Sequence, residues 1–326
     1  MTRPREDELR GLLARGRAYA EAGDARAAAS FFAAALRSAG QAVPAPLAAE
    51  VQEARAYLER TKQAYAAHLE RAIAAADAGP RMDEAFDIML GRRGVEPRRV
   101  PYPQRPSAFY FPGLPQRPFY EREAFPWAAR VEAASAAIRA EAQALLDRGE
   151  SFAPYVQAEK NRPQRDFHGM QDDPSWGAFY LWKDGERIAE NAARCPATMA
   201  ALEGVPLTQI PGRTPSVLFS LLRPGAHIPP HHGMLNCRLI CHLPLIVPPG
   251  CWLRVGGETR QWEDGKLLIF DDSIEHEAKN GSERLRLVLL FDIWRPELSE
   301  AERAAVAAMF TAIDAFAAPA AAQRDA

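Results

Sequence analysis

The first 78 residues carry a helical pattern of apolar positions in a background rich in Ala, Glu and Arg. Gly23-Asp24 interrupts the pattern, and a further helix is expected from about Pro46 to Ala78. The small and aromatic residues of the first two helices have the spacing of one tetratricopeptide repeat, with Leu12, Gly16, Tyr19, Ala28, Phe32 and Ala35. A plain helical hairpin explains the pattern equally well. Residues 1–78 are therefore predicted to form a repeat-like helical module.

The next segment, residues 79–107, is expected to be a linker. Prolines recur from Pro97 onwards and are interleaved with aromatic residues such as Tyr102 and Phe109. Proline fixes φ and lacks a backbone N–H group, which disfavours a regular helix or a central strand. Because a free linker carries few aromatic residues, we expect this proline-rich stretch to pack on the surface of the domain that follows.

Residues 108–326 have the pattern of a β-rich domain flanked by helices. The apolar spacing predicts one helix from Phe125 to Asp147 and another from about Ser299 to Phe316. Between them lie short apolar runs separated by Gly and Pro turns, which predict strands at residues 178–183, 216–222, 237–247, 250–255, 266–270 and 285–294. Many short strands of this kind favour a jelly roll. The predicted fold class is α+β, a double-stranded β-helix with an N-terminal helical module.

Composition and charge narrow the function classes. The net charge is −2, and basic and acidic residues are interleaved, so no nucleic-acid partner is expected. There is no run of about 18 apolar residues and no apolar signal core, so we expect a cytoplasmic protein without a membrane segment. The four cysteines show no metal-site spacing and are predicted to be small buried residues.

Two histidines in the β-rich region are the strongest candidates for chemistry. His231 and His276 are 45 residues apart, and Arg286 follows the second by ten. A mononuclear iron site of the facial type uses two histidines and one carboxylate. The carboxylate commonly stands two residues after the first histidine, where this chain has Gly233. From spacing alone, a hydrogen-bonded structural histidine is the more frequent outcome.

The residues around these histidines resemble a known family, the aspartyl/asparaginyl β-hydroxylases, which are iron(II)/2-oxoglutarate oxygenases. The resemblance covers roughly residues 108–298 and rests on the stretches at 118–120, 125–127, 176–191, 219–227, 231–239, 242–243, 270–277 and 291–294. It implies a jelly-roll oxygenase domain, and as cofactors and cosubstrates it implies Fe(II), 2-oxoglutarate and O2.

The same resemblance implies roles for individual residues around the iron. His231 and His276 are the implied iron ligands, and Gly233 is the residue that the family carries in place of the carboxylate. Adjacent His232 and nearby His227 compete with His231 from the residues alone. The acidic residues just before His276, namely Asp271, Asp272 and Glu275, are expected to orient the imidazole or to cap the turn. A carboxylate ligand from one of them is the alternative that the family pattern argues against.

Cosubstrate binding is expected from a second group of residues. The resemblance implies that Arg286 pairs with a carboxylate of 2-oxoglutarate, a role that suits a guanidinium on an apolar strand. Ser220 and His242 match the remaining cosubstrate contacts of the family, and Trp176 matches a tryptophan at the mouth of the active site. The other tryptophans of the domain, Trp182, Trp252, Trp262 and Trp294, are expected in the core.

One position departs from the family. Ile240 stands where the family usually has a second arginine that helps to hold an acidic group in the active site. Arg238, two residues earlier, is on the same face of the predicted strand and is expected to compensate in part.

The function implied is hydroxylation of a side-chain carbon, with β-hydroxylation of Asp or Asn in a peptide or protein as the first expectation. Helical modules of the N-terminal kind commonly present concave binding surfaces, which favours such a substrate. The alternatives are a lipid A acyl chain, a free amino acid, or a non-catalytic binding protein built from helical repeats and a barrel.

Overall fold

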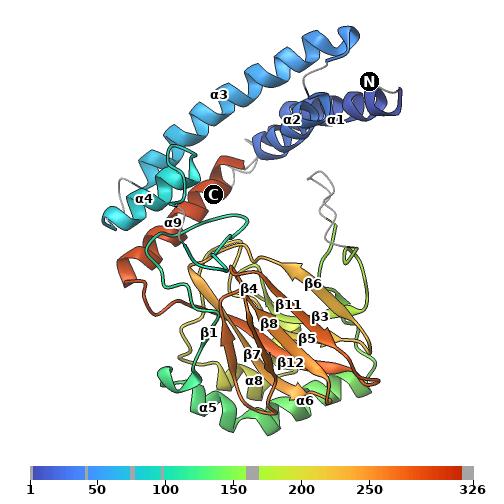
Figure 1. Cartoon of the computed structure of the whole chain (residues 1–326), viewed down its shortest axis with the longest axis vertical. Coiled ribbons are helices and arrows are strands. Elements are labelled where there is room, and N and C mark those ends of the chain that lie inside the picture. The colour runs from blue at the N-terminus through green and yellow to red at the C-terminus, as the bar shows by residue number, and fades with distance from the viewer. Residues whose placement is uncertain (1–2, 41–42, 74–77, 97–98, 159–168, 318–326) are drawn as a thin grey trace. The chain divides into compact units, whose positions relative to one another are not determined.

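The computed structural model describes residues 3–40, 43–73, 78–96, 99–158 and 169–317. The chain divides into two compact units (Figure 1). We call residues 1–77, 158–165 and 308–326 the helical unit, and residues 78–157 and 166–307 the barrel unit. Within the described residues no helix is both long and apolar enough to cross a lipid bilayer.

The helical unit begins with three helices, as the sequence pattern predicts. They are α1 (Arg3–Glu21), α2 (Ala25–Ala39) and α3 (Ala48–Ile73), and a 3-10 turn, η1 (Ala45–Leu47), precedes α3. Asp24 caps α2, since its side chain accepts a hydrogen bond from the Ala27 N–H group at 2.8 Å. Gly16 lies so close to Phe32 that a Cβ atom there would be 2.6 Å from the ring. The glycine therefore allows α1 and α2 to approach.

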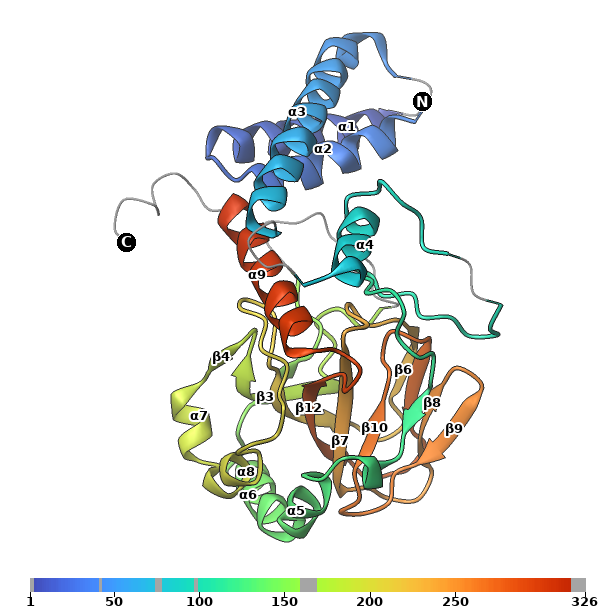
Figure 2. The same ribbon diagram turned by 90° about the vertical axis from the view of Figure 1, so that its left-hand side faces the viewer.

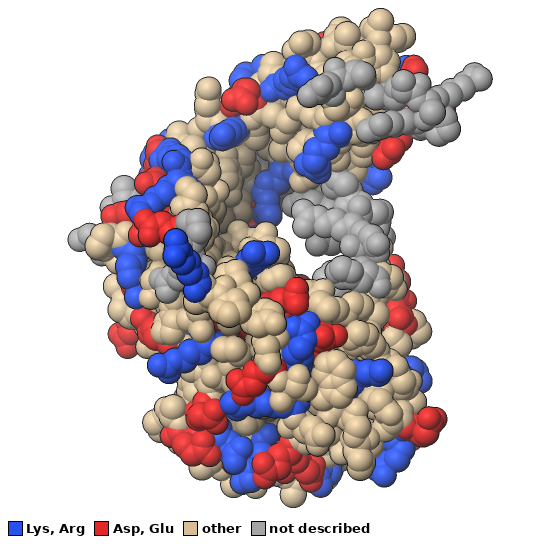
Figure 3. Space-filling model, viewed as in Figure 1, with Lys and Arg blue, Asp and Glu red and all other residues tan. Residues whose placement is uncertain are grey.

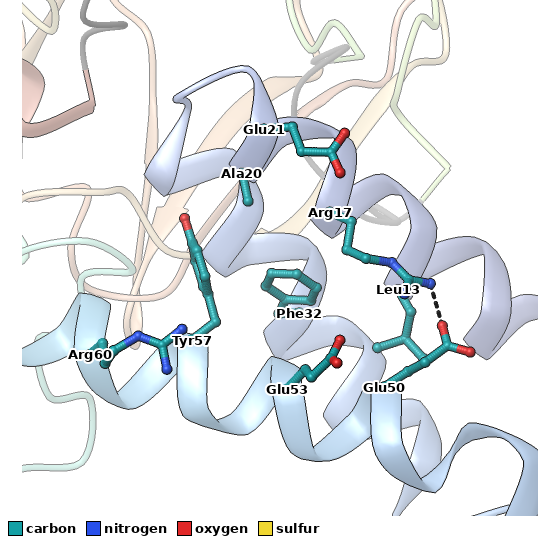
Figure 4. A pocket seen from close by; sticks show the side chains of 9 residues that line it. All are labelled: Leu13, Arg17, Ala20, Glu21, Phe32, Glu50, Glu53, Tyr57 and Arg60. Atoms are coloured by element: carbon teal, nitrogen blue, oxygen red, sulfur yellow. Dashed lines mark hydrogen bonds and ion pairs between the residues drawn. The ribbon is translucent and has the colours of Figure 1, made fainter.

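A groove of about 260 Å³ lies among these three helices (Figure 4). Apolar side chains including Leu13 and Phe32 line it, and the Tyr57 ring contacts that of Phe32 with 5.0 Å between centroids. Arg17 and Glu50 form an ion pair at its edge, where Glu21, Glu53 and Arg60 also lie. The groove therefore has an apolar floor and a charged edge.

The barrel unit starts with a helix that the sequence pattern did not predict, α4 (Pro80–Met89). Gly79 at its N-cap has a φ of 82°, and Pro80 occupies the first turn, where its missing N–H group costs nothing. The residues from 99 to 118 are irregular, as their prolines predict, and hydrogen bond to the loops of the barrel. The Arg105 N–H group donates to Ser273 O at 2.7 Å and the Ser107 N–H group to Gly233 O at 2.9 Å.

Two antiparallel sheets form the barrel and confirm the predicted jelly roll and the α+β class (Figures 1 and 2). The larger sheet has the strand order β1-β10-β7-β12-β5-β3-β2, with β4 paired to β3, and the smaller has the order β6-β11-β8-β9. The strands are β1 (Phe119–Tyr120), β2 (Ala153–Pro154), β3 (Trp176–Lys183), β4 (Glu186–Arg187), β5 (Val217–Leu222), β6 (His227–His231), β7 (Arg238–Ile246), β8 (Cys251–Val255), β9 (Glu258–Gln261), β10 (Leu268–Phe270), β11 (His276–Asn280) and β12 (Arg286–Trp294).

Helices cover the outer face of the larger sheet (Figure 2). The single helix predicted from Phe125 to Asp147 is wrong, because the segment forms two helices, α5 (Ala128–Ala133) and α6 (Ser135–Asp147), after the 3-10 turn η2 (Arg122–Ala124). The chain changes direction at Ala134, where ψ is −3°. Two short helices, α7 (Ala189–Ala193) and α8 (Pro196–Ala201), complete this layer, and α9 (Glu300–Ala317) follows the last strand as predicted.

The two faces of the larger sheet have different cores. Leu239, Cys241 and Leu243 of β7 belong to the outer core with Phe291 of β12, packed against α5 and α6. The alternate residues of the same strands face the smaller sheet, because successive side chains on a strand point to opposite sides. All four cysteines are free and buried, as the sequence predicts. Basic and acidic side chains are interspersed over the visible face of the barrel unit (Figure 3).

Candidate active site

The inner face of the barrel brings the two candidate histidines together. His231 ends β6 and His276 begins β11, and they are register partners in the smaller sheet. Their ring centroids are 4.1 Å apart. Antiparallel pairing of β6 and β11 thus closes the 45-residue gap between the two imidazoles.

Backbone carbonyls fix the tautomer of both rings. His231 Nδ1 is 2.8 Å from Pro229 O, and His276 Nδ1 is 3.0 Å from Ile274 O. A carbonyl oxygen only accepts, so each Nδ1 carries the proton and donates it. Each Nε2 atom therefore has a lone pair, which is the form of histidine that binds a metal ion.

Both imidazoles are neutral at physiological pH. Burial lowers the pKa of His231 to about 3, and the neighbouring His276 lowers it as well. Burial also lowers the pKa of His276 to about 4. The protein environment therefore disfavours protonation, the reaction that competes with metal binding at an imidazole.

A carboxylate fills the space beside Gly233. A Cβ atom at Gly233 would lie 2.1 Å from Asp272 Oδ2, so only glycine fits at this position without a shift of Asp272. Asp272 is buried and accepts a hydrogen bond from Arg238 Nη2 at 3.1 Å. Its Oδ1 atom is buried without a hydrogen-bond partner among the described residues, which leaves an acceptor for a donor such as water.

Arg238 is held by two carboxylates. Its Nη1 atom donates to Asp292 Oδ2 at 2.7 Å, in addition to the bond from Nη2 to Asp272. Asp292 is fully buried and also accepts a hydrogen bond from the Ser216 N–H group. Arg238 therefore holds the Asp272 carboxylate next to the histidines, a contact that the sequence did not indicate.

A buried network holds the loop between β10 and β11. Asp271 accepts hydrogen bonds from Arg295 Nη1 at 2.7 Å, from Gln104 Nε2 at 2.6 Å and from Ser273. Asn236 donates to Gln104 Oε1 at 3.0 Å and so ties the loop after β6 to the same network. The proline-rich stretch therefore helps to position the loop that carries Asp272 and leads to His276.

The other candidates for a metal ligand, His227, His232 and Glu275, do not share the pairing of His231 with His276. His227 Nε2 is 2.7 Å from Glu277 Oε2, and its side chain is 41% exposed. Glu275 pairs with Arg254 Nη2 at 3.1 Å. His232 follows the strand residue that pairs with His276 and has no register partner of its own. Of the candidate histidines in the described part of the chain, His231 alone is a register partner of His276.

A second polar cluster lies on the same inner face and contains Arg286 and Ser220. Arg286 is only 1% exposed, and its Nη1 atom donates to Ser220 O at 3.3 Å. No ion pair of Arg286 is found in the part of the chain that the structure describes, and its Nε atom has no hydrogen-bond partner there. Burial lowers the Arg286 pKa to about 10, so the guanidinium remains charged at neutral pH. Such a cation favours an anionic ligand.

Two tryptophans and a histidine complete this cluster. Trp176 Nε1 donates to Ser220 Oγ at 3.2 Å, and Trp262 Nε1 donates to His242 Nδ1 at 3.2 Å. The guanidinium carbon of Arg286 lies 5.0 Å from the centre of the Trp262 ring. From the sequence, Trp262 is expected in the core, and no motif or spacing distinguishes it from the other tryptophans of the domain. Its contacts with two site residues come only from the fold.

Aromatic and apolar side chains surround the polar groups. Tyr155 stacks on Trp176 with 4.0 Å between ring centroids, and the ring centroids of Trp176 and His231 are 6.3 Å apart. Ile240 is 6% exposed and packs in the inner core that also contains Phe270. The position of the family arginine is thus occupied by an apolar side chain between Arg238 and His242 on the inner face of β7.

This arrangement suits a metal ion held by few protein atoms. Among the described residues there is no group of three or more His, Cys, Asp or Glu side chains in metal-binding geometry. The protein would therefore offer two neutral imidazoles and leave the other positions of a metal open for small ligands. The lone pairs of both Nε2 atoms and the spare Asp272 oxygen fit such a site.

Comparison with known proteins agrees with the resemblance noted in the motifs. A family model described as aspartyl/asparaginyl beta-hydroxylase matches residues 132–296. The chain is 38% identical over 187 residues to the ornithine lipid ester-linked acyl 2-hydroxylase of Rhizobium tropici. This match covers 56% of this chain and 63% of that protein. It is 35% identical over 173 residues to human aspartyl/asparaginyl beta-hydroxylase, with 53% of this chain and 21% of that protein covered.

A third relative, human aspartate beta-hydroxylase domain-containing protein 2, is 32% identical over 212 residues, with 64% of this chain and 55% of that protein covered. The chain thus spans less than two thirds of each of these relatives. The family match takes in just over half of the 326 residues and includes both histidines, Gly233 and Arg286. This chain belongs to the aspartyl/asparaginyl beta-hydroxylase family.

Proposed function

We propose that this protein is an Fe(II)- and 2-oxoglutarate-dependent dioxygenase that hydroxylates a side-chain carbon. The observation that carries the proposal is the pairing of two neutral histidines, His231 and His276, in the barrel interior that also holds the buried cation of Arg286. The two histidines offer ligands for a metal ion, and the Arg286 cation offers a partner for a carboxylate.

The chemistry would come from the bound groups. With iron, 2-oxoglutarate and O2 present, one oxygen atom enters the C–H bond of the substrate and the other enters succinate, with release of CO2. In this proposal His231 and His276 hold the iron through Nε2. Arg286, Ser220 and His242 hold 2-oxoglutarate.

The remaining site residues support this arrangement. We assign Arg238 to holding Asp272 beside the metal position, because both of its η nitrogens are bonded to carboxylates. Trp176 and Tyr155 form an aromatic wall next to His231, which limits access of water to the site.

The proposed substrate is an Asp or Asn side chain in a peptide or protein, which would be β-hydroxylated. Two mammalian relatives, from human and mouse, carry the name aspartyl/asparaginyl beta-hydroxylase. The groove of the helical unit, with its apolar floor and charged edge, suits a peptide segment.

A second candidate substrate is an acyl chain. The Rhizobium tropici relative is named as an ester-linked acyl 2-hydroxylase. Ile240 favours this candidate, because an apolar side chain in the inner core neither attracts a substrate carboxylate nor donates a hydrogen bond to it.

The test is succinate formation by the purified protein with Fe(II), ascorbate and 2-oxoglutarate, in the presence of Asp- or Asn-containing peptides or of acylated lipids. We expect succinate above the level of a His276→Ala variant, and an increase with only one of the two substrate classes. Arg286→Met should raise the KM for 2-oxoglutarate at least about 30-fold, the loss expected for a charged hydrogen-bonded pair of about 2–3 kcal/mol. Succinate at or below the His276→Ala level in every mixture would favour the non-catalytic binding protein instead.

A further inference from the structure

Trp262 contacts two of the site residues, His242 and Arg286. It follows β9, is 6% exposed, and lies between Arg286 and His242. Its indole N–H group points to His242 Nδ1 at 3.2 Å, and its ring faces the Arg286 guanidinium at 5.0 Å. The rings of Trp262 and His242 are inclined by 30° with 5.9 Å between centroids.

The donor in this contact is unambiguous. An indole N–H group can only donate, so His242 Nδ1 accepts and carries no proton. The proton of the neutral His242 ring must then be on Nε2. This is the opposite tautomer to that of His231 and His276, whose Nδ1 atoms donate to backbone carbonyls.

The three inner histidines therefore differ in what their Nε2 atoms offer. His231 and His276 present a lone pair, which suits a metal cation. His242 presents an N–H group, which suits an anion, and it lies in the same interior as the Arg286 cation. The difference follows from one hydrogen-bond partner for each ring: a carbonyl for two of them and an indole for the third.

The indole ring also stabilises the buried charge. Arg286 has no ion pair among the residues that the structure describes, and contact with the face of a tryptophan stabilises a cation in such a site. Trp262 thus contacts the guanidinium of one donor and sets the direction of the other.

We propose that Trp262 is a positioning residue for the cosubstrate, which fixes His242 in the Nε2–H tautomer so that His242 and Arg286 together donate to a carboxylate. The inference rests on the proposed function, since the carboxylate is that of 2-oxoglutarate. Trp262 acts through His242 and Arg286 and is not itself a catalytic residue.

The first test reads the tautomer in the native sequence by ¹⁵N NMR of the histidine rings, in metal-free and Zn(II)-loaded protein. The chain has 7 histidines, and a His242→Gln variant identifies the signals of His242. We expect a protonated Nε2 and an unprotonated Nδ1 at His242, and the reverse at His231 and His276. A protonated Nδ1 at His242 would overturn the inference, whether or not the protein proves to be an oxygenase.

The second test is Trp262→Phe, which keeps an aromatic ring against Arg286 and removes the N–H group. Calorimetry with 2-oxoglutarate in the Mn(II)-loaded protein should show binding weakened about 10- to 150-fold, as expected for the loss of one hydrogen bond to a charged group. Mn(II) affinity should be unchanged, and the His242 signals should shift towards the other tautomer.

Trp182→Phe is the matched control, because Trp182 packs against the outer core and its Nε1 atom has no hydrogen-bond partner in the described part of the chain. It should leave 2-oxoglutarate binding unchanged. Equal binding by Trp262→Phe and the native protein would refute the positioning role. If the native protein itself binds no 2-oxoglutarate, the proposed function fails, while the NMR result still decides the tautomer.

Discussion

At the scale of single residues, hydrogen-bond partners decide what identical side chains can do. Arg238 and Arg286 both face the interior, but two carboxylates bind Arg238 and no ion pair of Arg286 is seen among the described residues. The first is therefore a support for Asp272, and the second is suited to an incoming anion. From the sequence, Arg286 is expected to pair with the cosubstrate and Arg238 to compensate for Ile240. The carboxylate partners of Arg238 could not be predicted, because Asp292 lies on β12 and Asp272 lies in the loop between β10 and β11.

Gly233 gives a test of how the metal position is shaped. Gly233→Ala would place a Cβ atom 2.1 Å from Asp272 Oδ2, so the Asp272 carboxylate must move away from Arg238. We expect a loss of about 1–3 kcal/mol in the free energy of unfolding, together with weaker metal binding. Chemical denaturation and metal titration measure these two effects.

Asp272→Ala is the partner for a double-mutant cycle, since it removes the three atoms nearest to the new methyl group. Gly233→Ala should cost at least about 1 kcal/mol less in that background than in the native protein. Additive effects of the two substitutions would contradict the close contact and the explanation that it offers for the glycine.

At the scale of elements, the two strands that hold His231 and His276, β6 and β11, are among those that the sequence pattern did not predict. The six predicted strands are apolar runs, and all are present. β6 contains Pro229 and Pro230, which is tolerated because β6 is an edge strand. β11 has the sequence His-Glu-Ala-Lys-Asn, and its buried positions are His276, Ala278 and Asn280. Because inward positions of β6 and β11 hold polar residues, these strands lack the apolar alternation that identifies a strand in a sequence.

The proline-rich stretch gives a prediction at the same scale. Gln104→Ala removes one donor from the buried Asp271 carboxylate and one acceptor from Asn236. We expect the free energy of unfolding of the barrel unit to fall by about 1–3 kcal/mol, the usual effect of leaving buried polar groups unsatisfied. Tryptophan fluorescence during denaturation reports this change.

Gln143→Ala is the control for Gln104→Ala, because among the described residues the Gln143 side chain bonds to Asp147 alone, in an exposed contact on α6. Its effect should stay within about 0.5 kcal/mol. If Gln104→Ala is as mild as the control, the proline-rich stretch does not hold the loop before His276.

At the scale of the whole molecule, the three histidines, Ser220 and Arg286 of the site come from five strands of two sheets. Ser220, His242 and Arg286 lie on β5, β7 and β12 of the larger sheet, and His231 and His276 lie on β6 and β11 of the smaller sheet. The alternation along each strand predicted which of these side chains share a face. The pairing of the strands and the stacking of the two sheets are tertiary features, so the contacts of Trp262, Asp272 and Gln104 were beyond reach from the sequence.

The neutral state of both histidines has a consequence for metal affinity. The folded pKa values, about 3 for His231 and about 4 for His276, lie below the ordinary value. Protons therefore begin to compete with a metal only as pH falls towards 4. Two imidazoles with ordinary pKa values near 6.5 would instead lose about 100-fold in affinity between pH 8 and pH 5.5.

The most direct test of the account is a calorimetric titration with Mn(II), a redox-stable substitute for Fe(II), at pH 8 and at pH 5.5. The native protein should bind one ion per chain with nearly equal affinity at both pH values. His231→Ala and His276→Ala should each lose the binding, and His232→Ala should keep it. Full binding by either of the first two variants, or loss of binding in His232→Ala alone, would contradict the two-histidine site.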